Sequence, residues 1–154
     1  MRKFKILSLV LILMVGVVCF SACKFEYYKT YTLEILTDNM APTLEVGDKV
    51  KVRSNDTYKS GDIIAYSENN LMYISRIVFV LEEDNKKYYI CHSDNNVNLD
   101  GTAADGEWED DAAYLQDLVA DGATKQDVID DCGMMVVFVT FGQIQGSCIE
   151  IIKK

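Results

Sequence analysis

The fold is decided by residues 72–91, which read MYISRIVFVLEEDNKKYYIC. Met72–Leu81 is rich in β-branched and aromatic residues, which is typical of a β-strand. Glu82–Lys86 has the polar composition of a turn, and Lys87–Cys91 returns as a second apolar strand. This stretch therefore predicts a β-hairpin.

Five further strands are predicted on the two sides of the hairpin. The pattern is clearest in KVKVR, where Val50 and Val52 share one face and Lys49 and Lys51 share the solvated one. The five are Lys29–Leu36, Lys49–Arg53, Ile63–Tyr66, Met134–Phe141 and Cys148–Ile152, with Gly142 and Gly146 expected to bracket the turn between the last two. About seven strands without regularly alternating helices favour a mostly antiparallel β fold.

One acidic segment, residues 100–131, interrupts the strands. It holds 11 of the 24 acidic residues and one base, Lys125. Asp110–Asp121 predicts a helix that ends at Gly122, and its apolar face consists of Tyr114, Leu115, Leu118 and Val119. Thr124–Asp127 resembles a capping box that opens a second short helix ending at Gly133. We interpret the segment as a helical insert that docks one apolar stripe on the sheet; a partner-binding lobe is the alternative.

Composition sets limits on the class of protein. The chain has 154 residues and a formal net charge of −9. This length fits one domain with a modest core, and the acidic balance disfavours nucleic acid as a partner. One His and scattered Cys residues disfavour a zinc finger or zinc ribbon.

The first 22 residues differ from the rest of the chain. Three basic residues within Met1–Lys5 precede Ile6–Ala22, a run of 17 uncharged residues. This pattern is typical of an export signal or a membrane anchor. The run ends in Phe20–Cys23 (FSAC), which resembles a bacterial lipobox with Cys23 as the lipidated residue. Residues 1–22 are therefore expected to be a signal or anchor, and residues 23–154 one domain at the outer face of the cytoplasmic membrane.

Four short motifs occur in order along the domain. They are NMAPTL at Asn39–Leu44 followed by GDKV at Gly47–Val50, then GDIIAY at Gly61–Tyr66, then Ser75-Arg76, and then SDN at Ser93–Asn95 followed by Asp100. Gly47-Asp48 and Gly61-Asp62 are also ordinary turn signals before strands. Together the motifs resemble those of the signal peptidase I family of serine proteases. The resemblance implies a mostly antiparallel β fold with a shallow peptide groove at the outer face of the membrane.

Two departures from the family pattern bear on catalysis. Asn39 occupies the position of the nucleophilic Ser, and Ser75 occupies that of the general-base Lys. Asn39 has no hydroxyl to deprotonate, and Ser75 has no amine to accept a proton. Loss of either group from a comparable catalytic set costs about 10⁶ in turnover. The sequence therefore predicts a non-catalytic relative in which Arg76 is a structural partner for Asp94 and not a base.

The expected function is binding of an extended peptide or preprotein segment by strand addition. The expected edges are Leu33–Asn39 and Tyr73–Ile77, and an accessory role in secretion or surface pilus assembly, with pilin or sortase-linked proteins as partners, follows from the resemblance. The expected groove residues are Leu36, Asn39, Met40, Pro42, Tyr73 and Ser75, and the expected structural residues are Gly47, Asp48, Gly61, Asp62, Arg76 and Asp94.

Two other functions stay open. One is an active peptidase of the same family using other residues, although Lys49, Lys51 and the single His92 are better explained as a solvated strand face and a rim residue. The other is a lipoprotein binding module that works through the acidic insert. An EF-hand-like spacing at Asn96, Asn98, Asp100, Gly101 and Glu107 follows a predicted strand, so we interpret it as coincidence and expect no metal or cofactor.

Overall fold

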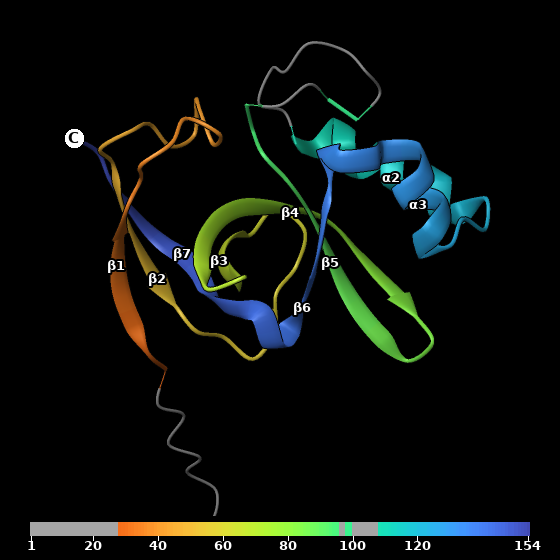
Figure 1. Cartoon of the computed structure of the whole chain (residues 1–154), viewed down its shortest axis with the longest axis horizontal. Helices are drawn as coiled ribbons and strands as arrows, with labels where there is room; N and C mark the ends of the chain where they lie inside the picture. The colour runs from red at the N-terminus through yellow and green to blue at the C-terminus, as the bar shows by residue number, and fades with distance from the viewer. Residues whose placement is uncertain (1–27, 96–97, 100–107) are drawn as a thin grey trace, which may run out of the picture.

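The computed structural model describes residues 28–95, 98–99 and 108–154 (Figure 1). Three predictions lie outside these residues: the signal or anchor segment, lipidation at Cys23, and most of the EF-hand-like spacing. Within the described ranges, no helix is long and apolar enough to cross a membrane.

The domain is built on one antiparallel sheet of seven strands, in the order β1-β2-β7-β3-β4-β5-β6. This confirms the prediction of a mostly antiparallel β fold. The strands are β1 (Thr30–Glu34), β2 (Lys49–Arg53), β3 (Ile63–Glu68), β4 (Leu71–Glu83), β5 (Lys86–His92), β6 (Val137–Thr140) and β7 (Ile144–Ile152). In β2 the two Val side chains are buried and the Lys side chains face outward, as the alternation predicted.

The predicted hairpin is present as β4 and β5. Its tip is Asp84-Asn85, and both residues have positive φ angles, 50° and 59°. Asp and Asn tolerate this left-handed conformation, which two-residue hairpin turns require. Strand β4 has 13 residues, and it pairs with β3 through Leu71–Arg76 and with β5 through Arg76–Glu83. The long strand is therefore shared between two neighbours, one at each end.

The last two strands differ from the prediction. Strand β6 is shorter than Met134–Phe141 because short 3₁₀ turns, η1 (Gly133–Met135) and η2 (Phe141–Gln143), lie on either side of it. Strand β7 begins at Ile144, so Gly146 lies inside a strand and not in a turn. A Cβ on Gly146 would lie 2.6 Å from the backbone carbonyl of Arg53. This Gly permits close approach of two strands, a role that sequence alone does not distinguish from a turn.

Two helices cover one end of the sheet. They are α2 (Trp108–Ala120) and α3 (Lys125–Cys132), and Figure 1 shows both beside β5 and β6, far from β1. The predicted capping box is present, because the Thr124 hydroxyl and the Asp127 carboxylate each bond to the backbone of the other residue. Leu115 is fully buried against Val78 and Ile90 of the sheet, which confirms the predicted apolar stripe.

We predict that Gly146→Ala destabilises the protein. The added methyl group meets backbone atoms of Arg53, which cannot rotate away, so we expect a loss of about 1–3 kcal/mol in the free energy of unfolding. Urea denaturation of the full-length protein measures this loss. Gly142→Ala is the matched control because nothing lies within 4 Å of its added Cβ. Equal stability of the two variants would contradict the close strand approach.

Candidate functional site

A buried ion pair between Arg76 of β4 and Asp94 lies at the centre of the site region. The Arg76 Nε donates to Asp94 Oδ1 at 2.9 Å, and Nη2 donates to Oδ2 at 2.6 Å. The pair is bidentate, which is the strongest geometry for a guanidinium and a carboxylate. The predicted structural partnership of these two residues is thus present as a contact.

The same guanidinium joins the other motifs. Its Nη1 donates to the Gly61 carbonyl at 3.1 Å, and its Nη2 donates to the Thr43 hydroxyl at 3.2 Å. That hydroxyl donates in turn to Asp94 Oδ2 at 2.5 Å. Separately, the Asn95 amide donates to the Asn39 carbonyl at 3.1 Å. All four motifs, which span Asn39–Asn95 in the chain, therefore meet around Arg76.

Gly61 is required at this junction for two reasons. Its φ is +90°, a left-handed conformation that side chains with a Cβ rarely adopt. A Cβ here would also lie 2.9 Å from the Trp108 ring, and that ring lies 5.9 Å from the Arg76 guanidinium. The Gly61-Asp62 turn, the helical insert and the central ion pair are consequently packed together.

Asp48 forms a second buried polar contact beneath the NMAPTL segment. Its carboxylate accepts from the Lys153 ammonium at 2.8 Å and from the Glu45 amide at 2.9 Å. These bonds lower the pKa of Asp48 from its ordinary value of 3.8. Lys153 also donates to the Thr43 carbonyl at 3.0 Å. The end of the chain thereby fixes the segment that leads from Asn39 to β2.

A cavity of about 360 Å³ lies where β1 ends and β4 begins. It has a mostly apolar lining contributed by two segments far apart in sequence. The lining residues are Leu33, Glu34, Ile35, Leu36, Thr37, Asn39, Met40, Met72, Tyr73 and Ile74. Four of the six predicted groove residues, Leu36, Asn39, Met40 and Tyr73, therefore line one cavity.

On the β4 side, this cavity is bordered by a strand edge that no described strand pairs with. Asn39 Nδ2, on the cavity side, donates to the Ile74 carbonyl at 3.3 Å, whereas Ile77 exchanges hydrogen bonds with Gly61 and Asp62 on the β3 side. Because backbone groups alternate along a strand, those of Met72 and Ile74 point away from β3. No described strand pairs with them there, since the β5 pairing begins at Arg76.

On the β1 side, too, the edge has no pairing partner among the described residues. Ile35 bonds to Asp48 and Gly47 on the β2 side, so the backbone groups of Glu34 and Leu36 point outward by the same alternation. Strand β1 is the outermost strand of the sheet within the described residues. Two open edges, one from each segment, therefore border the same cavity.

Asn39 and Ser75, the two residues that the resemblance aligned with a nucleophile and a base, have different surroundings. Asn39 is half-buried, and its carboxamide spans the cavity wall by accepting from the Thr37 hydroxyl and donating to Ile74. Ser75 is 5% exposed and its hydroxyl donates to the His92 carbonyl at 2.7 Å. Neither Ser75 nor the exposed Pro42 lines the cavity. Of the six predicted groove residues, Pro42 and Ser75 thus lie outside this cavity.

His92 is buried and not at the rim. Its Nδ1 lies 2.8 Å from Asp111 Oδ2, and Asp111 Oδ1 accepts from the Leu99 amide at 2.7 Å. Asp111 lies in the first turn of α2, and sequence reasoning missed its role because a buried carboxylate and a solvated one look alike in an acidic stretch. The contact attaches the insert to β5.

Sequence reasoning also missed Glu34, Met72 and Ile74 as cavity residues. The predicted edges contained Glu34 and Ile74, but the alternation that turns their backbone groups toward the cavity depends on which neighbour each strand pairs with. Tertiary pairing alone supplies that information.

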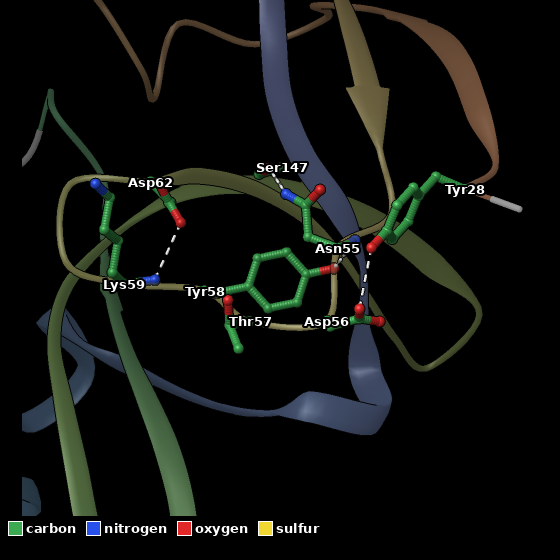
Figure 2. Close-up of a pocket in the computed structure, with 8 residues that line it drawn as sticks. All are labelled: Tyr28, Asn55, Asp56, Thr57, Tyr58, Lys59, Asp62 and Ser147. Atoms are coloured by element: carbon green, nitrogen blue, oxygen red, sulfur yellow. Dashed lines mark hydrogen bonds between the residues drawn. The ribbon is translucent and has the colours of Figure 1, made fainter. Parts of the chain in front are cut away.

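A second cavity, of about 630 Å³, lies beside the loop between β2 and β3 (Figure 2). Its polar groups are mostly bonded to one another. Tyr28 donates to Asp56 at 3.0 Å, the Asn55 amide donates to the Tyr58 hydroxyl at 3.1 Å, and Asn55 Nδ2 donates to Ser147 at 2.5 Å. The polar groups of this lining are therefore bonded to one another, whereas the cavity beside β4 is lined mainly by apolar groups.

The described residues contain no cluster of three or more His, Cys, Asp or Glu side chains that could hold a metal ion. Cys91, Cys132 and Cys148 are free thiols, and burial raises the pKa of Cys91 to about 12.

The sequence matches no protein-family model and no curated protein.

We predict that Arg76→Met is strongly destabilising. It leaves the buried Asp94 carboxylate without a cation, and breaking one side of a buried pair costs about 3–5 kcal/mol. Thermal and urea unfolding measure the loss. The control is Lys51→Met, which breaks the exposed Lys51–Glu150 pair and should cost at most about 1 kcal/mol. A small effect at Arg76 would show that the ion pair does not hold the motifs together.

We predict an acid-dependent contribution from Asp48. A carboxylate whose folded pKa is lowered stabilises the fold above its unfolded value near 3.8, and this stability is lost as the pH falls through the lower folded value. Asp48→Asn should therefore be less stable than the native protein at neutral pH, and the difference should shrink below pH 3.8. Urea denaturation across a pH series measures this. Asp38→Asn, at an exposed carboxylate nearby, is the control, and an equal pH-independent loss in both variants would contradict the assignment.

Proposed function

We propose that this protein is a non-catalytic, signal-peptidase-I-like binding protein that holds an extended peptide segment by strand addition. The observation that carries the proposal is the apolar cavity of about 360 Å³ bordered by the open edges of β1 and β4. An extended peptide that adds to such an edge gains main-chain hydrogen bonds, and the adjoining pocket gives selectivity.

The backbone groups available at the cavity support this mode of binding. Met72 can offer its amide and carbonyl, and Ile74 can offer its amide, because these groups point away from β3 and have no described strand beside them. Asn39 already donates to the Ile74 carbonyl at 3.3 Å, as the N–H of an added strand would do. Its carboxamide therefore protects the edge in the free protein and can exchange that bond with a bound segment.

The meeting of the four motifs around Arg76 supports the family resemblance as an argument for this site. Thr43, Gly61 and Asp94 come from three different motifs, and all three contact the one guanidinium. Motifs that match by coincidence have no reason to share a centre. The apolar cavity shares Asn39 with the first of these motifs, and we propose that it takes the place of the family's peptide groove.

The chemistry of the two substituted positions supports binding without cleavage. The Asn39 carboxamide is not a nucleophile, and the Ser75 hydroxyl is committed to the His92 carbonyl. Among the described residues, no Lys lines the cavity, so the lining offers no amine that could accept a proton. The resemblance extends the proposal to an extracytoplasmic accessory of secretion or surface pilus assembly, attached through the N-terminal segment by a lipid at Cys23 or by an anchor helix.

A proline substitution in the open edge of β4 tests strand addition. Ile74→Pro removes an amide that faces the cavity and leaves the β3 ladder intact, since Ile74 does not bond to β3. We expect at least about tenfold weaker binding of two labelled, end-capped hexapeptides, Ser-Thr-Leu-Lys-Thr-Ser and Ser-Thr-Ala-Gln-Thr-Ser, to the full-length protein in mild detergent. Fluorescence anisotropy measures the affinity.

Thr32→Pro is the matched control. It removes an outward amide from β1, the other open edge, at a position outside the cavity, so binding should be unchanged. If neither peptide binds the native protein, or if both proline variants bind as well as the native protein, peptide binding at this edge is wrong. The peptides should also be recovered intact by mass spectrometry, since cleavage would favour the active-peptidase alternative.

A further inference from the structure

The side chains that line the cavity indicate the chemistry of the segment that it would accept. The lining combines flexible and bulky apolar groups with one carboxylate, that of Glu34. Resting on the proposed function, we infer that the cavity selects an extended segment in which a large apolar residue stands next to a Lys or Arg. This deepens the proposal by naming the chemistry of the partner.

The preference for a large apolar residue follows from the volume of the cavity and the exposure of its apolar lining. A cavity of about 360 Å³ is far larger than a methyl group, so an Ala side chain would leave most of it empty. Leu36 is 78% exposed, Met72 47% and Tyr73 39%, so much apolar surface faces water when no segment is bound. A Leu-sized or larger side chain covers this surface, and Met40 and Met72 adjust to its shape because unbranched thioethers adapt readily.

The preference for a neighbouring Lys or Arg follows from the Glu34 carboxylate. Its exposed carboxylate forms no ion pair with another described residue, and Lys49, its register partner on β2, does not bridge to it. Asp38 adds a second exposed carboxylate on the same segment, and the whole chain has a net charge of −9. A cationic side chain therefore complements this end of the cavity.

The spacing of the two features follows from strand geometry. Leu33 and Glu34 are consecutive on β1, where Leu33 is half-buried and Glu34 is exposed. Side chains alternate between the two faces of a strand, and a strand added beside them alternates in step. The apolar and basic residues of the bound segment are thus expected at neighbouring positions.

Four capped hexapeptides test the inference on the full-length protein. The parent is Ser-Thr-Leu-Lys-Thr-Ser, and the others replace Leu by Ala, Lys by Gln, or both. We expect the Leu-to-Ala change to weaken binding at least about tenfold at any ionic strength. We expect the Lys-to-Gln change to weaken it about twofold to fivefold at low ionic strength and hardly at all at high ionic strength.

Two variants locate these preferences. Glu34→Gln should remove the preference for Lys and keep that for Leu, whereas Glu109→Gln, which removes an exposed carboxylate from α2, should keep both. If all four peptides bind alike, the selectivity is overturned while peptide binding stands; if none binds, the proposed function fails instead. A protein dimer that peptide dissociates, seen by light scattering, would assign the cavity to a second copy of the chain and overturn the inference.

Discussion

The contact between Arg76 and Asp94 is the constraint on which the site region depends. The buried guanidinium donates four hydrogen bonds, two to the Asp94 carboxylate, one to the Gly61 carbonyl and one to the Thr43 hydroxyl. Each of these partners belongs to a different turn or loop. Fixing one cation therefore fixes the relative positions of three connections that would otherwise move separately, and the segment that carries Asn39 is held against β4 as a result.

The open edge beside the cavity is a consequence of strand lengths. Strand β4 has 13 residues, more than either neighbour can pair with, because β3 has six and β5 has seven. Its first residues therefore pair on one side only. An unprotected strand edge can pair with another chain. Here the Asn39 carboxamide donates to one of the edge acceptors, the Ile74 carbonyl, at 3.3 Å. The carboxamide therefore covers part of the edge that the proposed peptide binding would use.

Much of the site could be predicted from the sequence. The residues that were predicted wrongly share one physical cause. The resemblance of the four motifs implied the Arg76–Asp94 contact and four of the cavity residues, whereas turn signals and apolar alternation predicted only local elements. Ser75 was expected in the groove, yet its hydroxyl points to the His92 carbonyl of the paired strand. Gly146 was expected in a turn, yet it lies in β7 against Arg53. Both differences arise from contacts between strands, about which a local pattern carries no information.

The sequence by itself determined the β-rich class, the hairpin of β4 and β5, the capped helix at Thr124 and the side-chain chemistry available at Asn39. These features depend on residue chemistry and on periodicity within a few residues of the chain. Only the tertiary structure decided that β1 and β4 leave open edges on one cavity, that His92 is buried against Asp111, and that Glu34 stands beside apolar side chains. The reason is that pairing partners, and with them the side to which each backbone group points, are set by residues distant in sequence.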